Sequence, residues 1–168
     1  KTIIQNLHTR DIRHDYIDWL TQKREFLRQA LEQDMKKGMI HGDIYWDNLL
    51  FSRDQLVAVI DFEEACFYFN LFDLGMTAVG CCGQGGAFDI QKVCALINGY
   101  QQCRAFNTRE KKQLKVFMEY AATAASSWRF HQYNIKYPGH DLADSYLELT
   151  SMADQIHDME DTVFMKAF

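Results

Sequence analysis

The sequence has a single proline, Pro138, and its first glycine is Gly38. It contains no low-complexity stretch and no internal repeat, so we expect one domain spanning residues 1–168. No apolar run approaches the length of about eighteen residues that a membrane-spanning helix needs, so no membrane partner is expected. Residues 1–10 have no apolar signal core and do not begin with methionine, and we interpret this end as the cut edge of a longer protein.

The sequence also lacks an excess of positive charge and any recognised cysteine motif. The net charge is −5 and the isoelectric point is about 5.6, whereas nucleic-acid-binding domains usually present a basic face. We therefore expect no nucleic-acid partner. The five cysteines form no CxxC pair and show no zinc-ligand spacing, which favours free, buried thiols in a reducing cytoplasm.

Apolar residues are abundant enough to build a core, with 48% hydrophobic and 14% aromatic residues in the chain. Their spacing predicts a mainly α fold of the α+β class, because helical periodicity dominates and only one short strand pair is evident. The expected helices cover residues 11–37, 72–79, 89–102 and 108–132, and a last helix opens at Asp144 or Ser145. Asp89 and Thr108 are expected as N-caps.

A small β-hairpin is predicted between the first two helices. Leu49–Phe51 and Leu56–Ile60 are short apolar runs, and the turn-like segment Ser52–Gln55 separates them. A strand that returns through so short a turn ends beside the start of its partner. Asn48 and Asp61 flank the two strands at that end, so we expect them to meet there.

Asp43 precedes the first strand by a few residues and should lie next to Asn48 and Asp61. Mg²⁺ prefers hard oxygen ligands and takes one or two of them from the protein, leaving the rest to water and phosphates. A further carboxylate that stays off the metal can accept the proton of an attacking hydroxyl. The three side chains therefore suit phosphoryl transfer, which depends mainly on positioning and charge neutralisation.

The letters around these residues carry a specific pattern. HGDIYWDNLLF followed by AVIDFEEA contains H-x-D-x-x-x-x-N, a strand and D-F, as in kinase catalytic and metal loops. The segment resembles the aminoglycoside phosphotransferase and choline kinase superfamily. The resemblance implies the C-terminal lobe of a protein-kinase-like fold, built as a helical bundle with a small catalytic-loop β-hairpin, and it implies ATP and Mg²⁺ as cofactors.

The same resemblance implies roles for individual residues. Asp43 is expected to be the catalytic base, and Asn48 and Asp61 are expected to bind the metal and, through it, the nucleotide cofactor. His41 would be a structural anchor of the loop. Asp73 matches the superfamily's buried aspartate that hydrogen-bonds the catalytic loop; on its own it would be an ordinary helix-start residue.

Later segments narrow the resemblance. Residues 72–74, 86–89 and 98–101, together with Arg104, are similar to the bacterial homoserine kinases of this superfamily, and the similarity covers about residues 39–132. It implies phosphorylation of a small amino-acid or amino-alcohol hydroxyl. Glu63 and Glu64 stand where aromatic residues are expected in that family, and residues 133–168 match no part of it.

The features that grip ATP in kinases are absent from the sequence. No glycine-rich loop precedes the hairpin, and the early lysines lie at the terminus or on the first predicted helix. The glycine-rich segment Gly80–Gly86 lacks phosphate-loop spacing and is expected to be a flexible loop. We therefore expect the N-terminal lobe to be a missing partner of this chain and the fragment alone to be inactive. The apolar surface that the lobe would cover is a possible route to homo-oligomers.

Alternatives remain open at three residues. Asp47 orients the loop or touches substrate, Glu63 is a solvated acid or meets a substrate ammonium group, and Arg129 makes a surface ion pair or binds a substrate carboxylate. Homoserine is the first choice of acceptor, with an aminoglycoside or choline/ethanolamine as the alternative. A non-catalytic kinase-like module that binds a partner is the alternative from another class.

Overall fold

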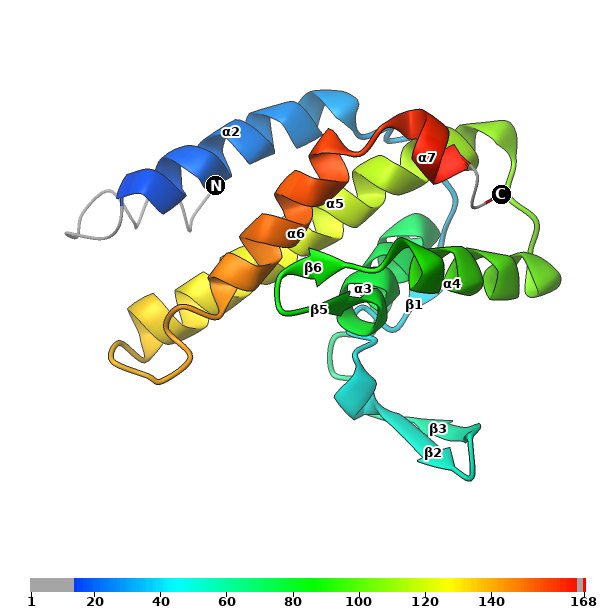
Figure 1. Ribbon diagram of the computed structural model, residues 1–168, viewed down its shortest axis with the longest axis horizontal. Coiled ribbons are helices and arrows are strands. Elements are labelled where there is room, and N and C mark those ends of the chain that lie inside the picture. The colour runs from blue at the N-terminus through cyan, green and yellow to red at the C-terminus, as the bar shows by residue number, and fades with distance from the viewer. Residues whose placement is uncertain (1–13, 166–167) are drawn as a thin grey trace.

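The computed structural model describes residues 14–165 and residue 168, and the fold is mainly α as the sequence predicts (Figure 1). Within this part of the chain, no helix combines the length and apolar character needed to cross a membrane. The long helix α5 continues directly into a π-helix, His131–Lys136. The helices are α2 (His14–Ala30), α3 (Asn70–Cys82), α4 (Ile90–Cys103), α5 (Thr108–Phe130), α6 (Tyr146–Asp158) and α7 (Asp161–Met165).

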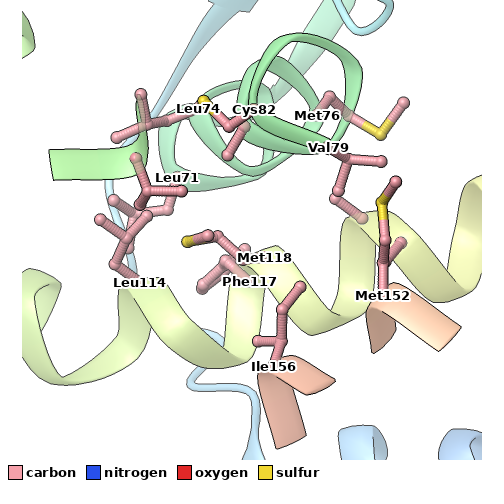
Figure 2. Packing of buried hydrophobic residues seen from close by; sticks show 14 of the residues in the cluster. Leu71, Leu74, Met76, Val79, Cys82, Leu114, Phe117, Met118, Met152 and Ile156 are labelled. Carbon is pink, nitrogen blue, oxygen red and sulfur yellow. The ribbon is translucent and has the colours of Figure 1, made fainter. Parts of the chain in front are cut away.

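The core lies where α3 packs against α5 and α6. Helices α5 and α6 run side by side in opposite directions (Figure 1), and α3 packs mainly against α5. Figure 2 shows apolar side chains of α3 meeting those of the two long helices, with Phe117 and Met118 of α5 in the middle. Phe117 is fully buried, so its packing at this contact contributes hydrophobic stabilisation to the helical body formed by α2 to α6.

A buried ionic network joins α2 to the rest of this body. Lys23 Nζ lies 2.9 Å from a Glu119 carboxylate oxygen and 3.0 Å from one of Asp154. The Trp19 indole N–H donates to Asp154, and His157 Nδ1 lies 3.0 Å from Glu119. The network therefore holds α2 against α5 and α6, in addition to the apolar contacts of Tyr16 and Leu20.

Among the described residues, the strands form three antiparallel pairs. Strand β1 (Lys37–Ile40) pairs with β4 (Cys66–Phe69), and the short strands β5 (Gly83–Gln84) and β6 (Ala87–Phe88) pair with each other. Strands β2 (Leu49–Ser52) and β3 (Gln55–Val59) form the predicted hairpin, which projects away from the helices in Figure 1.

The hairpin turn sets the pairing of Ser52 with Gln55, and the register shifts between Leu50 and Phe51 farther along the strands. Arg53 and Asp54 have φ angles of 47° and 65°, as a two-residue turn that matches the right-handed strand twist requires. Asparagine, aspartate and glycine tolerate this conformation best, so Asp54 suits its position.

Two predicted helices have wrong boundaries. The predicted helix 11–37 ends at Ala30, because the Gln113 side chain accepts from the Glu32 N–H and donates to the Ala30 carbonyl, closing the helix end. The residues 11–13 of that prediction lie outside the described residues. Helix α3 is longer than the predicted 72–79 on both sides.

The structure also tests the two predicted N-caps and the predicted loop at Gly80–Gly86. Asp89 caps α4 as predicted, accepting from the N–H groups of Gln91 and Lys92. Asn107, and not Thr108, caps α5, because Asn107 and Glu110 form a reciprocal capping box. The segment Gly80–Gly86 is not a free loop, since it completes α3 and forms the β5–β6 turn.

The cysteines are free as expected, but not all of them are buried as the sequence predicts. Cys82 is buried in the core, whereas Cys66 and Cys103 are exposed. Cys66 lies in β4, where alternate side chains face outward, and Cys103 ends α4.

Candidate functional site

The site forms where β1, the hairpin and α3 approach one another. The segment His41–Asn48, here called the 41–48 loop, connects β1 to β2 and ends in a 3₁₀ turn at Trp46–Asn48. At the foot of the hairpin, the Ile60 N–H donates to the Asn48 carbonyl at 3.0 Å. Asp61 follows Ile60 directly, so the return strand delivers Asp61 to the end of the hairpin where Asn48 lies.

Asp43 and Asn48 are in direct contact. The buried Asn48 side chain donates through Nδ2 to the Asp43 carbonyl at 2.9 Å and to the Asp43 carboxylate at 3.2 Å. With Nδ2 committed to Asp43, the Asn48 Oδ1 is the atom that can serve as a ligand. The contact also fixes the direction of the Asp43 carboxylate.

The surroundings of Asp43 raise the pKa of its carboxyl group. Burial raises the pKa of Asp43 above its ordinary value, and the negative charges of Asp47 and Asp61 raise the pKa further. The Asn48 hydrogen bond and the proximity of His41 oppose this rise. A carboxylate with a raised pKa is a stronger proton acceptor when ionised, which suits a general base.

Asp61 has an unusual backbone. Its φ angle is 64°, in the left-handed region that non-glycine residues rarely adopt and that is enriched at functional sites. The Asp61 side chain is exposed, and its charge acts on Asp43. The sequence-predicted trio is therefore gathered at one place, with Asp43 and Asn48 in contact and Asp61 beside them.

The buried His41 ring joins the two ends of the site. Its Nε2 lies 2.9 Å from the Ile60 carbonyl oxygen, and the Asp43 N–H donates to its Nδ1 at 3.3 Å. These partners require the proton on Nε2, which donates to Ile60. His41 thereby links the backbone of Asp43 to the residue before Asp61, and its ring packs against Phe62.

Asp73, in the first turn of α3, holds the start of the loop. Its carboxylate accepts from the backbone N–H of Gly42 at 2.8 Å and from that of His41 at 3.3 Å. Gly42 has a φ of 85°, and a Cβ there would lie 2.9 Å from the Glu64 carbonyl oxygen. Only glycine fits this position without strain.

Of the three residues with open alternatives, Asp47 lies beside Asp43, Glu63 follows shortly after Asp61 in the chain, and Arg129 lies on α5. Asp47 and Glu63 are exposed, and Asp47 is near enough to Asp43 to influence its pKa. Arg129 donates to the Ser145 carbonyl at 3.1 Å and lies 3.5 Å from Glu148, so it forms the expected surface ion pair. Burial raises the pKa of Tyr45 to about 12, and Arg129 opposes that rise, which places Arg129 within electrostatic reach of the 41–48 loop.

Asp47 is a candidate from the sequence, but its neighbours Ile44, Tyr45 and Trp46 are not among the residues predicted to belong to the site. The Trp46 indole N–H donates to the Cys81 carbonyl at 3.0 Å, and Tyr45 lies against Gly80. Two aromatic residues inside a short polar loop were the only sequence signal for these contacts with α3.

The donor set fits magnesium better than a transition metal. Among the described residues, no three His, Cys, Asp or Glu side chains are arranged to hold a metal ion. Asn48 Oδ1 and the Asp61 carboxylate are both hard oxygen donors. Mg²⁺ is commonly bound through one or two protein groups together with substrate phosphates and water, so this pair suits Mg²⁺.

Comparison with known proteins agrees with this chemistry. The profile of a family described as the phosphotransferase enzyme family matches residues 4–106, more than half of the chain. The chain therefore belongs to the phosphotransferase enzyme family.

Within that family the chain is similar to homoserine kinases. It is 33% identical to the homoserine kinase of Methylocella silvestris over 104 residues, covering 61% of this chain and 32% of that protein. It is 28% identical to that of Rhizobium meliloti over 123 residues, covering 73% of the chain and 38% of that protein. The homoserine kinase of Zymomonas mobilis is 33% identical over 106 residues, covering 62% and 33%. The matches thus span about a third of each relative's length.

Proposed function

We propose that the full-length protein containing this chain is an ATP- and Mg²⁺-dependent phosphotransferase that acts on the hydroxyl group of a small metabolite, with homoserine the first choice. The observation that carries this proposal is the contact of Asp43 with Asn48 at the foot of the hairpin that delivers Asp61. Family membership supports the reaction class, and the similarity to homoserine kinases supports the acceptor.

In this proposal Asp43 is the catalytic base. It accepts the proton of the acceptor hydroxyl as that oxygen attacks the terminal phosphoryl group of ATP. The bond from the phosphorus to the leaving oxygen of ADP breaks as the new P–O bond forms. The raised pKa of Asp43 strengthens it as an acceptor, and the Asn48 hydrogen bond points its carboxylate toward the reacting centre.

Asn48 and Asp61 would hold Mg²⁺ and, through it, the phosphates of ATP. When bound, the ion neutralises charge on the phosphates and aligns them for in-line transfer. His41 and Asp73 position the loop: His41 through the Ile60 carbonyl, and Asp73 through the N–H groups of His41 and Gly42.

The acceptor is proposed to lie between the loop and the ends of α5 and α6. Homoserine carries an ammonium and a carboxylate group, so it needs partners of both signs. Asp47, an exposed acid near Asp43, and Glu63, an exposed acid shortly after Asp61 in the chain, could meet the ammonium group, and Arg129 could meet the carboxylate. Choline or an aminoglycoside, which have no carboxylate, would not need Arg129.

A panel of acceptors tests the proposal. The full-length protein is incubated with Mg²⁺-ATP and homoserine, choline, ethanolamine or an aminoglycoside, and ADP release is measured. We expect turnover with homoserine that Arg129→Ala weakens mainly through KM. Turnover of choline or an aminoglycoside without homoserine would remove the acceptor assignment and keep the reaction class. No turnover with any acceptor would count against the class itself.

The apolar surface of the hairpin supports a missing N-terminal lobe as the partner of this chain. Leu50, Phe51, Leu56 and Val57 are between 45% and 62% exposed, although a hairpin this small is marginally stable by itself. A lobe that grips ATP and covers these residues would bury them. We therefore expect the chain alone to transfer no phosphate, and Mg²⁺-ATP at millimolar concentration to raise its Tm only slightly.

The same exposed hairpin favours one alternative of another class, a non-catalytic module that binds a partner protein or a second copy through this surface. Finding a β-rich, glycine-rich segment encoded upstream of Lys1 would favour the kinase. A gene that encodes only this region would favour the module.

We propose a cytoplasmic location, because ATP is abundant there and all five cysteines are free.

A further inference from the structure

Helix α3 contacts the 41–48 loop at two places, and only the first is accounted for by the proposed roles. Asp73 in its first turn holds His41 and Gly42. Gly80 lies seven residues later, about two helical turns on and therefore on nearly the same face of the helix. The loop returns to α3 at Gly80 and Cys81.

The second contact is unusually close. A Cβ at position 80 would lie 2.5 Å from the Ile44 carbonyl oxygen and 2.9 Å from the Tyr45 Cα. Both are backbone atoms that cannot rotate out of the way, so any side chain at position 80 must push the loop or the helix aside. Gly80 therefore sets how closely the loop approaches α3.

Hydrogen bonds fix the loop at the same point. The Trp46 indole N–H donates to the Cys81 carbonyl at 3.0 Å, and the Cys81 thiol lies 3.9 Å from the Ile44 carbonyl oxygen. Cys81 is in the last turn of α3, where carbonyl groups have no partner within the helix. Trp46 supplies that partner, while its ring stays 52% exposed. Its contact with α3 is thus more a directional link than core packing.

We propose that Gly80 and Cys81 form a seat for the 41–48 loop, and that Gly80 and Trp46 are positioning residues that hold Asp43 and Asn48 in the geometry needed for phosphoryl transfer. This proposal rests on the proposed phosphotransferase function. The three seated residues, Ile44, Tyr45 and Trp46, are three of the four residues that separate Asp43 from Asn48 in the chain, the fourth being Asp47. A shift of the seat therefore changes the relation between the proposed base and the proposed metal ligand.

Three glycine-to-alanine variants of the full-length protein separate positioning from stability. Gly80→Ala pushes on the loop. Gly75→Ala, in the same helix, pushes on the Phe117 carbonyl at 2.8 Å, which belongs to the core. Gly99→Ala in α4 meets nothing within 4 Å and controls for the effect of alanine on a helix.

For Gly80→Ala we expect kcat to fall by about 100-fold with KM for ATP and acceptor nearly unchanged, because small misplacements of reacting groups cost rates of this size. Gly75→Ala should lower Tm while the folded protein keeps its kcat. Gly99→Ala should keep the wild-type kcat and raise Tm slightly, because alanine favours a helix more than glycine does. A Gly80→Ala protein with the kcat of Gly99→Ala, while Asp43→Asn is inactive, would overturn the seat and leave the proposed function standing.

Trp46→Phe keeps the test decisive if Gly80→Ala does not fold. It retains an aromatic ring and loses the N–H that reaches Cys81, so kcat should fall by about 10-fold with little change in Tm. Wild-type kcat in this variant would contradict the role of Trp46 as a positioning residue.

Hydrogen exchange separates failure of the seat from failure of the function. Amides of residues 43–48 should exchange faster in Gly80→Ala and Trp46→Phe than in Gly99→Ala, whether or not an acceptor is turned over. Unchanged exchange in both variants would overturn the seat. Absence of turnover in the wild-type protein with faster exchange in the variants would overturn the proposed function alone.

Discussion

Phe117 in helix α5 is fully buried, whereas Phe51 in the β2–β3 hairpin is 50% exposed. The same residue type thus serves opposite purposes in two parts of one chain. The helical body buries its apolar side chains against its own helices (Figure 2). The hairpin projects from the body (Figure 1) and leaves apolar side chains on both strands uncovered.

This contrast in burial between the helical body and the hairpin explains how the site is positioned. The body is stabilised by its own core, so α3 is a firm support. The hairpin has little packing of its own and is fixed at its foot, where His41, Asn48 and Ile60 exchange hydrogen bonds. The proposed catalytic groups lie at this junction between a packed helix and a strand pair whose apolar side chains are exposed.

The largest expected effect tests the body. Phe117→Ala should lower the free energy of unfolding by about 3–5 kcal/mol, because it removes a large side chain from a packed core. Phe51→Ala, the matched change in the hairpin, should cost less than about 1 kcal/mol in this chain. Urea denaturation of both variants measures the contrast, and equal costs would break it.

The reactivity of the cysteine thiols should likewise depend on whether the side chain is buried or exposed. Burial raises the pKa of the Cys82 thiol to about 12, so almost no thiolate is present at pH 8, and alkylation of Cys82 should quicken as pH rises. The exposed Cys66 of β4 should be alkylated by iodoacetamide at least about 100-fold faster at pH 8. Peptide mass spectrometry measures both rates, with the urea-denatured chain as the control, where the rates should converge. Equal rates in the folded chain would contradict the burial of Cys82.

The junction should be sensitive to loss of Asp73. Asp73→Ala leaves the N–H groups of His41 and Gly42 without their acceptor, which should cost about 2 kcal/mol of stability. In the full-length protein kcat should fall by about 100-fold as the loop shifts.

Asp89→Ala is the matched control for Asp73→Ala. It removes the cap of α4, far along the chain from the 41–48 loop, and should cost about 1 kcal/mol. Activity should be unaffected. If both variants lost stability and neither lost activity, Asp73 would be an ordinary helix-start residue.

The smallest effect is expected on the hairpin surface. Val57 is 62% exposed, so Val57→Thr, which preserves shape and strand preference, should change the stability of this chain by less than about 0.5 kcal/mol. In the full-length protein the cost should rise to about 1 kcal/mol or more if a lobe buries this position. Identical small costs in both proteins would argue that no lobe covers the hairpin.

Much of this arrangement could be predicted from the sequence, because local signals carry it. The apolar alternation and turn around Arg53 and Asp54 identify the hairpin, and the spacing of Asp43, Asn48 and Asp61 identifies the groups at its foot. Asp89 announces the start of α4. Each of these features depends on residues close together in the chain.

The failures depend on partners distant in sequence. Helix α2 ends at Ala30 because of Gln113, and no local signal marks that end. The pairing of β1 with β4 was missed because Met39 and Phe67 lie on opposite sides of the hairpin in the chain. The contact of Trp46 with Cys81 likewise required the fold. Residues that hold the loop in place are therefore harder to identify from the sequence than the residues proposed to carry out the reaction.

Replacement of Asp43 tests the central claim most directly. Asp43→Asn keeps the size of the side chain and removes its basicity, and Asp54→Asn is the control, since asparagine tolerates the left-handed backbone of the hairpin turn. In the full-length protein with Mg²⁺-ATP and its acceptor, we predict that Asp43→Asn lowers kcat by about 1,000-fold with little change in Tm, while Asp54→Asn keeps wild-type turnover. An Asp43→Asn enzyme with the kcat of the wild type would contradict the assignment of the base and, with it, the proposed site.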